Sequence, residues 1–260
     1  MLKLPARREL SIEEKKHKKI ALRLTLFLLF LIFMQLIITS LLYSFSDWIA
    51  IFLFSILLIV PAYLSNAGMM VTGGGKPIDG GKSFKNGQRI LGDHKTWNGF
   101  IKGPLFIGIP ISIGIFVVLF ACWGFIESFI LTAIQQGIYA NYNNISDYSY
   151  YFIGGSFPIG FIFMIIRIIL CSYGAAFGDL VGSFIKRRFD YPSGAPFWLV
   201  DQLDFVSFSL VFVSIPALLF PSVFWLPDLN VLIFLLILTP SVSIFANTIA
   251  YMIGIKDVPW

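Results

Sequence analysis

Charged residues are scarce in this sequence, and their scarcity excludes an ordinary soluble domain. Only 13% of the 260 residues are charged, while 57% are hydrophobic and 28 are Phe. Soluble domains contain about a quarter charged residues. The formal charge of +5 would favour nucleic-acid binding only if the basic residues formed one face of a soluble fold. They lie in short segments between apolar runs, so the pattern predicts membrane topology and no nucleic-acid partner.

Cysteine is equally scarce. Cys122 and Cys171 are the two cysteines of the chain, which is too few for a disulfide framework, and their spacing fits no metal site. Both lie inside apolar runs, so we expect buried, unreactive thiols.

Six apolar stretches are long enough to cross a bilayer, which requires about 20 helical residues. They cover approximately 24–45, 47–71, 104–126, 151–177, 203–226 and 231–254. The first stretch has no cleavage site after it and is interpreted as a retained anchor. The sequence therefore predicts an all-α, polytopic transmembrane helix bundle with six spans.

The basic residues fall on one side of this predicted bundle. Eight of the 19 Lys and Arg residues lie in 1–23, six in 72–102 and three in 186–188, with Arg167 and Lys256 completing the set. The intervening segments 46–47, 127–150 and 227–230 contain none. The positive-inside rule then predicts a multi-pass cell-membrane protein with both termini and two polar loops in the cytoplasm. The Tyr-rich segment 127–150 is expected to form a belt at the outer surface.

The first polar loop, 72–102, is rich in glycine and basic residues. It contains eight glycines and six basic residues, with the runs Thr-Gly-Gly-Gly-Lys-Pro-Ile-Asp-Gly-Gly-Lys at 72–82 and Leu-Gly-Asp-His-Lys-Thr-Trp at 91–97. Glycines let backbone N–H groups approach an anion closely, and Lys or Arg neutralises its charge. A flexible connector enriched in positive charge is the alternative, but the composition favours phosphate binding.

The second polar segment, 178–204, combines basic and acidic residues. Asp201 and Asp204 are three residues apart, so they would share one face of a helix at the membrane surface. Mg²⁺ takes few protein oxygens and keeps water and phosphate ligands, so such a pair is suited to it. The basic residues 186–188 could bind phosphate, although the positive-inside rule alone would also place them there.

Six motifs in this order resemble the archaeal CDP-archaeol synthase family. They are residues 61–66, 73–81 and 91–97, Ser-Phe-Ile-Lys-Arg-Arg at 183–188, Asp-Gln-Leu-Asp at 201–204 and Lys-Asp-Val-Pro-Trp at 256–260. The motifs at 183–188 and 201–204 also resemble those of bacterial and eukaryotic CDP-diacylglycerol synthases. The resemblance covers about 60–260. It divides the chain into a basic tail with an extra span, 1–45, and a cytidylyltransferase transmembrane domain, 46–260.

The resemblance implies a membrane enzyme of phospholipid biosynthesis. CTP and the phosphate of an unsaturated diether glycerol lipid would give CDP-archaeol and pyrophosphate, with Mg²⁺ as cofactor and the lipid bilayer as surroundings. A phosphate monoester is already mostly dianionic near neutral pH, so no general base is needed. Neither His17 nor His94 is then required as a proton carrier. The alternatives are a CTP- or ATP-dependent lipid or polyprenol kinase and a non-enzymatic anion transporter.

On this interpretation, the site forms between the two polar segments. The candidate catalytic residues are Lys95, Lys186, Asp201 and Asp204. The candidate Mg²⁺ ligands are Asp179, Asp201 and Asp204. The residues expected to bind CTP or phosphate are Asn66, Gly74, Gly75, Lys82, Arg89, Asp93, Thr96, Arg187 and Arg188. Arg167, within a span, is expected either to face the bundle interior or to extend towards the membrane surface, and to meet lipid phosphate or a carbonyl.

Overall fold

The described part of the chain is helical almost throughout. The computed structural model describes residues 11–85, 87–138, 145–154, 159–191, 196–221, 224 and 226–253. Its elements are α1 (Ile12–Leu42), α2 (Phe45–Thr72), α3 (Trp97–Lys102), the π-helix η1 (Gly103–Gly108), α4 (Ile109–Ala121), α5 (Trp123–Gln136), α6 (Ile145–Ile153), α7 (Ile159–Arg188), α8 (Val200–Leu219) and α9 (Leu229–Met252). Two isolated bridges, Pro77 with Thr96 and Ser83 with Arg89, are the strand-like pairings in these residues. The predicted all-α class is confirmed.

Six helical segments are long and apolar enough to cross a membrane, as predicted. They are α1, α2, the continuous segment Trp97–Ala121, α7, α8 and α9. Helix α1 begins earlier than expected, at Ile12, because Ser11 and Glu14 form a capping box there. The chain is therefore a multi-pass membrane protein.

The second polar segment is not the loop that we predicted. Helix α7 continues through Gly178 to Arg188 instead of ending near residue 177. No proline interrupts this stretch, and its three basic residues at 186–188 suit the C-terminal end of a helix dipole. As a result, the polar residues of this stretch are fixed on a helix.

The predicted tyrosine belt at 127–150 is also wrong for its described part. Helix α5 runs on to Gln136, and Tyr148 of α6 is buried, with its ring 6.0 Å from that of Phe54. Tyr139 and Tyr142 lie outside the described residues. Cys171 is buried, as expected, but Cys122 is exposed because it forms the turn between α4 and α5.

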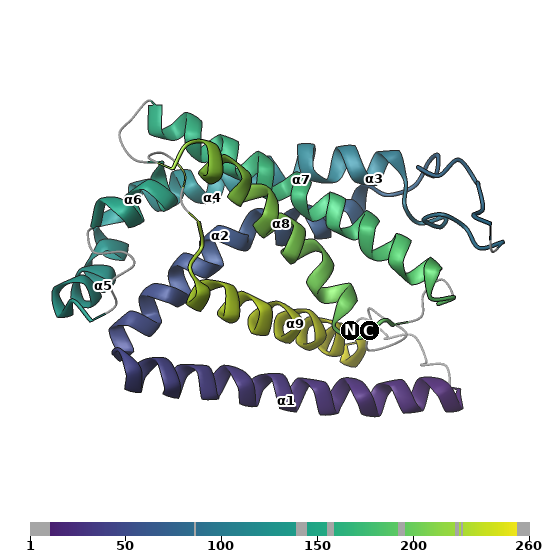
Figure 1. Ribbon diagram of the computed structural model, residues 1–260, viewed down its shortest axis with the longest axis horizontal. Helices are drawn as coiled ribbons and strands as arrows, with labels where there is room; N and C mark the ends of the chain where they lie inside the picture. The colour runs from purple at the N-terminus through teal and green to yellow at the C-terminus, as the bar shows by residue number, and fades with distance from the viewer. Residues whose placement is uncertain are drawn as a thin grey trace, which may run out of the picture.

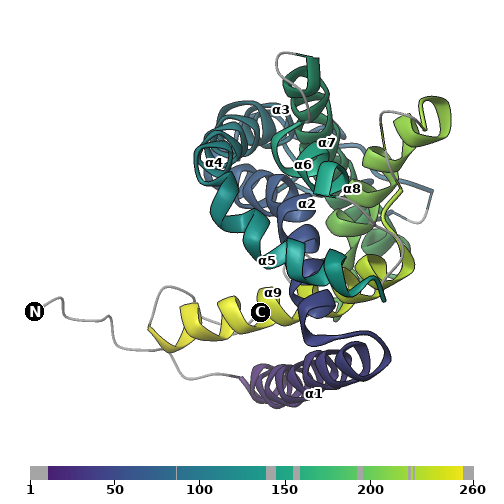
Figure 2. The same cartoon turned by 90° about the vertical axis from the view of Figure 1, so that its left-hand side faces the viewer.

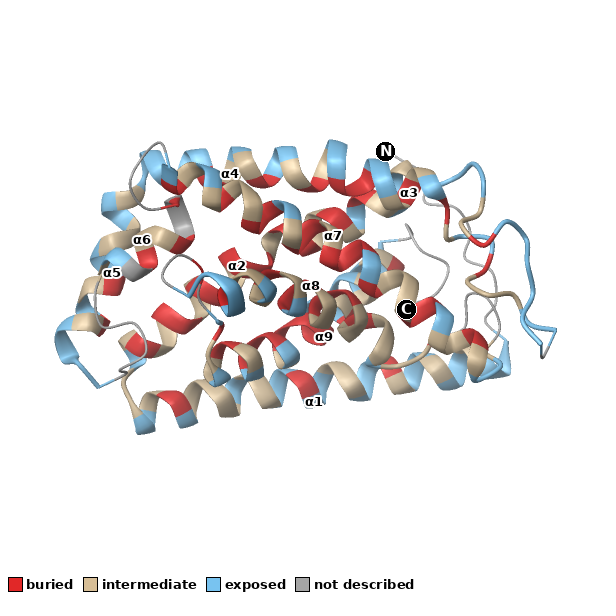
Figure 3. Ribbon diagram, turned by 45° about the horizontal axis from the view of Figure 1, so that its top comes forward, coloured by how far each residue is buried: buried red, intermediate tan, exposed pale blue. Residues whose placement is uncertain are grey.

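Helix α2 forms the centre of the bundle. Its buried side chains, which include Ile51, Phe54 and Leu58, belong to a core shared with α7, α8 and α9. In Figure 3 the buried positions gather on these inner helices, whereas α1 and α4 have long exposed faces. The exposed faces are apolar, as lipid contact requires.

Three glycines bring α7 and α8 into close contact. Gly174, Gly178 and Gly182 are spaced four residues apart and therefore share one face of α7. A Cβ atom at Gly174 would lie 2.8 Å from Ser209 Cα, and one at Gly178 would lie 2.4 Å from the carbonyl oxygen of Asp204. Small residues of this kind allow helix backbones in membranes to approach closely.

Helix α1 lies at the outside of the bundle. It packs against α2 and α9, and Figure 2 shows it at one edge of the bundle, next to α9. Along the long axis in Figure 1, the start of α1, the loop between α2 and α3, the C-terminal end of α7 and the start of α8 all lie at the same end. Helices α5 and α6 lie at the opposite end. The fold thus gathers the two polar segments at one end of the bundle.

Candidate active site

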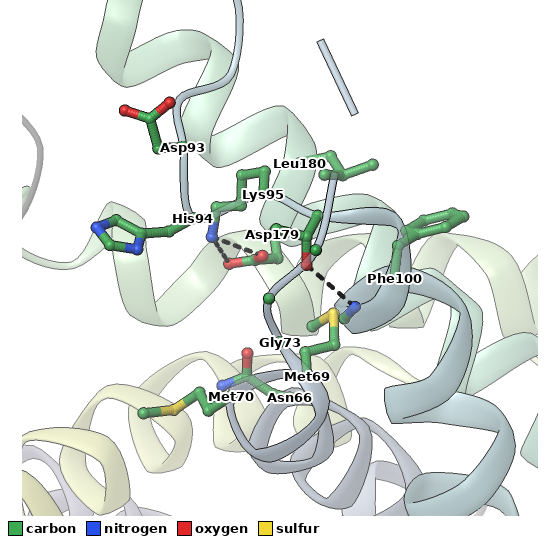
Figure 4. A pocket seen from close by; sticks show the side chains of 14 residues that line it. Asn66, Met69, Met70, Gly73, Asp93, His94, Lys95, Phe100, Asp179 and Leu180 are labelled. Atoms are coloured by element: carbon green, nitrogen blue, oxygen red, sulfur yellow. Dashed lines mark hydrogen bonds and ion pairs between the residues drawn. The ribbon is translucent and has the colours of Figure 1, made fainter. Parts of the chain in front are cut away.

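A cavity of about 470 Å³ opens at the polar end of the bundle. It lies where the C-terminal end of α2 meets the 73–96 loop, the start of α3 and the middle of α7 (Figure 4). The residues that line it are Asn66, Met69, Met70, Gly73, Gly74, Gly75, Asp93, His94, Lys95, Thr96, Gly99, Phe100, Asp179 and Leu180. Its size is typical of small-molecule sites, and it combines apolar walls with a few charged groups.

Lys95 and Asp179 form an ion pair in this cavity. The Lys95 ammonium donates to both carboxylate oxygens of Asp179, each at 2.7 Å (Figure 4). About a quarter of each side chain is exposed, so both groups remain accessible from the cavity. The pair connects the polar loop to α7, which are 84 residues apart in the chain.

Asp79 organises the polar loop, a role that we did not predict. Its buried carboxylate accepts from Arg89 Nη2 at 2.6 Å and from the backbone N–H groups of Gly81, Leu91 and Gly92, each at 3.1 Å. Burial acts to raise the pKa of Asp79, but the hydrogen bonds from Arg89 and the backbone outweigh it and hold the pKa well below its ordinary value. The loop is therefore an ordered structure and not a flexible connector.

Arg89 and Arg188 support the loop instead of lining the cavity. Arg89 pairs with both Asp79 and Asp93. Arg188 donates to the carbonyl oxygen of Arg89 at 2.9 Å, and its guanidinium lies over the ring of Phe84, 4.3 Å from the centroid. These contacts use the donors of Arg89, since the close approach of loop and helix could not be seen in the sequence. Arg188 Nε and Nη1 are buried without an acceptor in the described part of the chain, so phosphate binding by Arg188 stays a prediction.

A second, smaller cavity of about 110 Å³ adjoins the first and shares His94 and Lys95 with it. The other residues that line it are Leu91, Gly92, Ser183, Lys186 and Arg187. Arg187 is buried and donates to the carbonyl of Tyr191, but its Nε–H is buried with no protein acceptor in the described part of the chain. Lys186 pairs with Asp201 at 2.9 Å.

The three predicted metal ligands are neighbours. Asp204 is close enough to Asp179 and Asp201 to interact electrostatically with both. Its carboxylate lies against Gly182, where a Cβ atom would be 2.0 Å from Oδ2. Within the described ranges, no three His, Cys, Asp or Glu side chains converge closely enough to hold a metal ion. Asp179 and Asp201 are instead each held by a lysine.

The cavity contains most of the other predicted residues, but not all of them. Asn66, Gly74, Gly75, Asp93 and Thr96 line it. Gly75 has a φ of +81°, and a Cβ atom there would lie 2.7 Å from the Asn98 side chain, so only glycine fits without strain. Lys82 is exposed and lines neither cavity.

Sequence reasoning missed several features of the site. His94 lines both cavities, although we assigned it no role. Met69, Met70, Phe100 and Leu180 supply apolar wall. The sequence could not identify them as cavity-lining residues, because apolar residues occur throughout a membrane protein. The glycine spacing in α7 was a readable signal for close helix packing.

Arg167 lies away from both cavities. It donates to the carbonyls of Tyr150 and Tyr151 at 2.6 and 3.1 Å, and it lies over both of their rings. We expected a lipid phosphate or a carbonyl as the partner of Arg167, and the structure shows two backbone carbonyls. Arg167 therefore fixes α6 against α7.

Comparisons with known proteins identify relatives over most of the chain. The family model described as CarS-like, CDP-archaeol synthase, matches residues 48–260. The CDP-archaeol synthases of Methanococcus aeolicus and Archaeoglobus fulgidus are 39% and 36% identical, each over 79% of this chain, and the matches cover 95% and 96% of those proteins. A solved structure described as an intramembrane enzyme for archaeal membrane lipids biosynthesis is 26% identical with a TM-score of 0.47, covering 74% of this chain and 91% of that chain.

Proposed function

Since the chain belongs to the CDP-archaeol synthase family, we propose that its 470 Å³ cavity binds CTP for the cytidylyl transfer of this family. The chain is a membrane cytidylyltransferase that forms CDP-archaeol from CTP. The observation that carries the proposed location is the Lys95–Asp179 pair beside Gly74 and Gly75. A cation, a carboxylate and exposed backbone thus lie in one cavity, as a metal-bound triphosphate requires.

The reaction requires positioning more than proton transfer. An oxygen of the lipid phosphate attacks the α-phosphorus of CTP, the bond between that phosphorus and the bridging oxygen to the β-phosphate breaks, and pyrophosphate leaves with the electron pair. The attacking oxygen is already ionised near neutral pH. Catalysis therefore consists of bringing two anions into line and neutralising the charge that develops on the leaving group.

The two adjoining cavities support separate places for the two substrates. We assign the triphosphate of CTP to the larger cavity and the lipid phosphate to the smaller one, which Lys186 and Arg187 line. Lys95 belongs to both cavities, so it would contact the α-phosphate where the two substrates meet. The buried Nε–H of Arg187 is a donor suited to a phosphate oxygen.

The acidic residues fit a role in holding Mg²⁺. Asp204 is half-buried with Asp179 and Asp201 close to it, and lysines pair with those two, so a further cation would compensate the charge of Asp204. In our proposal, Asp179, Asp201 and Asp204 hold the ion together with phosphate oxygens. Bound Mg²⁺ would neutralise phosphate charge and polarise the phosphorus under attack.

We also propose that the site faces the cytoplasm, where CTP is available. The loop, the end of α7 and the start of α1 contain most of the basic residues, and they lie at one end of the bundle (Figure 1). The positive-inside rule assigns that end to the cytoplasm, together with both termini. Residues 1–10 and 254–260, with the motif at 256–260, lie outside the described residues.

The proposed function is tested by following the label from CTP into lipid. Purified protein in lipid nanodiscs is supplied with Mg²⁺, an unsaturated diether lipid phosphate and CTP labelled at either the α- or the γ-phosphate. We expect the α-label in the lipid and the γ-label in pyrophosphate. Transfer of the γ-label to the lipid would mean a kinase, and no transfer of either label would exclude both enzymes. Lys85→Ala, which changes a basic residue of the loop outside both cavities, is the matched control for Lys95→Ala.

A further inference from the structure

Two lysines assigned to phosphate each hold a carboxylate assigned to the metal. Lys95 pairs with Asp179 at 2.7 Å, and Lys186 pairs with Asp201 at 2.9 Å. Each pair joins different segments, the loop to α7 in the first and α7 to α8 in the second. The same arrangement therefore occurs twice in the site, so two lysines and two carboxylates neutralise each other before any substrate arrives.

Asp204 interacts electrostatically with members of both pairs but has a different environment. Its carboxylate accepts the backbone N–H of Phe205 and lies against Gly182, and it interacts electrostatically with Asp179, Asp201 and Lys95. The lysines therefore hold two of the three carboxylates, which agrees with the lack of a converged metal-binding group in the described part of the chain.

We propose that Lys95 and Asp179 exchange partners when metal and nucleotide bind together. Lys95 leaves Asp179 for a phosphate oxygen, and Asp179 turns to the cation that accompanies that phosphate. The Lys186–Asp201 pair is built for the same exchange with the lipid phosphate. This inference rests on the proposed function of the cavity, and it adds a role for Lys95 as the internal counter-ion of a metal ligand.

The exchange makes metal binding and nucleotide binding depend on each other. Metal-free CTP must break the Lys95–Asp179 pair and leaves the carboxylate facing an anion without compensation. Metal alone must break the same pair and leaves Lys95 facing a cation. Either ligand therefore binds weakly alone and strengthens the other by the same factor, as linkage requires. Couplings of this kind are about 5- to 150-fold.

The test measures metal-free binding in a variant that lacks the carboxylate. Asp179→Asn keeps the shape of the side chain but removes the charge that holds Lys95. We expect this variant to bind CTP in EDTA about tenfold more tightly than the original protein, in the range of typical coupling. We expect Mg²⁺ to strengthen its CTP binding less than it does in the original protein. Calorimetric titration of the full-length protein in nanodiscs gives both dissociation constants without any turnover.

Two controls separate partner exchange from a general change of charge. Asp93→Asn removes the same charge from the same cavity, but Asp93 pairs with Arg89 and not with Lys95. It should tighten metal-free binding much less than Asp179→Asn. The double variant Asp179→Asn with Lys95→Ala should lose the gain, because no lysine is left to be released.

The outcomes also distinguish this inference from the function on which it rests. If the original protein binds Mg²⁺–CTP tightly but Asp179→Asn does not tighten metal-free binding, partner exchange is wrong and the CTP site stands. If Asp93→Asn tightens metal-free CTP binding as much as Asp179→Asn does, the effect comes from the overall charge of the cavity, and partner exchange is again wrong. If the original protein binds CTP neither with nor without Mg²⁺, the proposed CTP site itself is wrong.

Discussion

The ammonium of Lys95 lies 2.7 Å from both carboxylate oxygens of Asp179, and this contact joins the polar loop to the middle of a membrane-spanning helix. Lys95 also lines both cavities of the site. In the proposed assignment of the two cavities, Lys95 therefore contacts both substrates at the point where their phosphates react.

We predict that Lys95→Ala and Arg187→Ala impair different substrates. Loss of Lys95 removes charge from the cavity assigned to CTP, so it should mainly raise the KM for CTP or lower kcat. Loss of Arg187 removes the buried donor of the smaller cavity, so it should mainly impair use of the lipid phosphate. Steady-state kinetics with each substrate varied in turn measures both effects. Equal impairment of both substrates by both variants would mean a single shared phosphate site.

Asp204→Asn should abolish most activity while the protein remains folded. The amide keeps the size of the carboxylate but loses the charge assigned to the metal. We expect a loss of at least on the order of 100-fold, and a similar loss for Asp201→Asn. Rates at limiting Mg²⁺, with thermal unfolding as the measure of folding, check this. Near-normal rates in both variants at low Mg²⁺ would mean that the metal binds elsewhere in the protein.

Gly182→Ala and Gly178→Ala should have contrasting effects. The new methyl at 182 would lie 2.0 Å from Oδ2 of Asp204, which can turn aside, and 2.9 Å from its Cβ, a milder overlap than the one at 178, so activity should fall more than stability. The methyl at 178 would meet the backbone of Asp204, which cannot move without separating α7 from α8, so stability should fall. Activity and melting temperature, measured on both variants in the same nanodiscs, show which variant loses activity and which loses stability. The same ratio of losses in both would contradict a specific contact with the Asp204 carboxylate.

The order of the polar loop should depend on pH through Asp79. Because its hydrogen bonds to Arg89 and the backbone lower its pKa in the folded protein, Asp79 stabilises the loop fully above its ordinary unfolded pKa of about 4. This stabilisation is lost as the pH falls below that value towards the lower folded pKa. We expect amide exchange protection of Leu91 and Gly92, whose N–H groups bind Asp79, to stay constant from pH 7 to 5, after correction for intrinsic rates. Asp79→Asn should lose that protection at every pH, and protection equal to that of the original protein would contradict this role.

Cysteine labelling should confirm that the polar end of the bundle is cytoplasmic. In a background without Cys122, which is exposed, a cysteine at Lys82 should resist a membrane-impermeant reagent in sealed cells. A cysteine at Gln136, at the exposed end of α5, should react. Both positions should react once the cells are opened. Labelling of Lys82→Cys in sealed cells would mean that the polar end faces outward and that the predicted topology is wrong.

Much of the fold could be read from the sequence because its cause is local. A run of about 20 apolar residues can satisfy its backbone in lipid only as a helix, so six such runs determine six spans. The ends of the helices depend on more than local composition, as α7 shows. The composition of residues 178–188 looked like a polar loop, but these residues continue the helix because their glycines pack against α8.

The residue types of the site were also determined by the sequence, since phosphate and metal select for glycine, basic and acidic residues. Which of these residues reach the cavity was decided by the tertiary structure. Arg89 has the same charge as Lys95, but Asp79 and Asp93 bind its donors, and Arg188 donates to the loop backbone and lines neither cavity. The Lys95–Asp179 ion pair and the Arg188 hydrogen bond to the Arg89 carbonyl join residues 84 and 99 positions apart. Such contacts depend on how loop and helix approach, and that approach comes from close packing, which composition does not record.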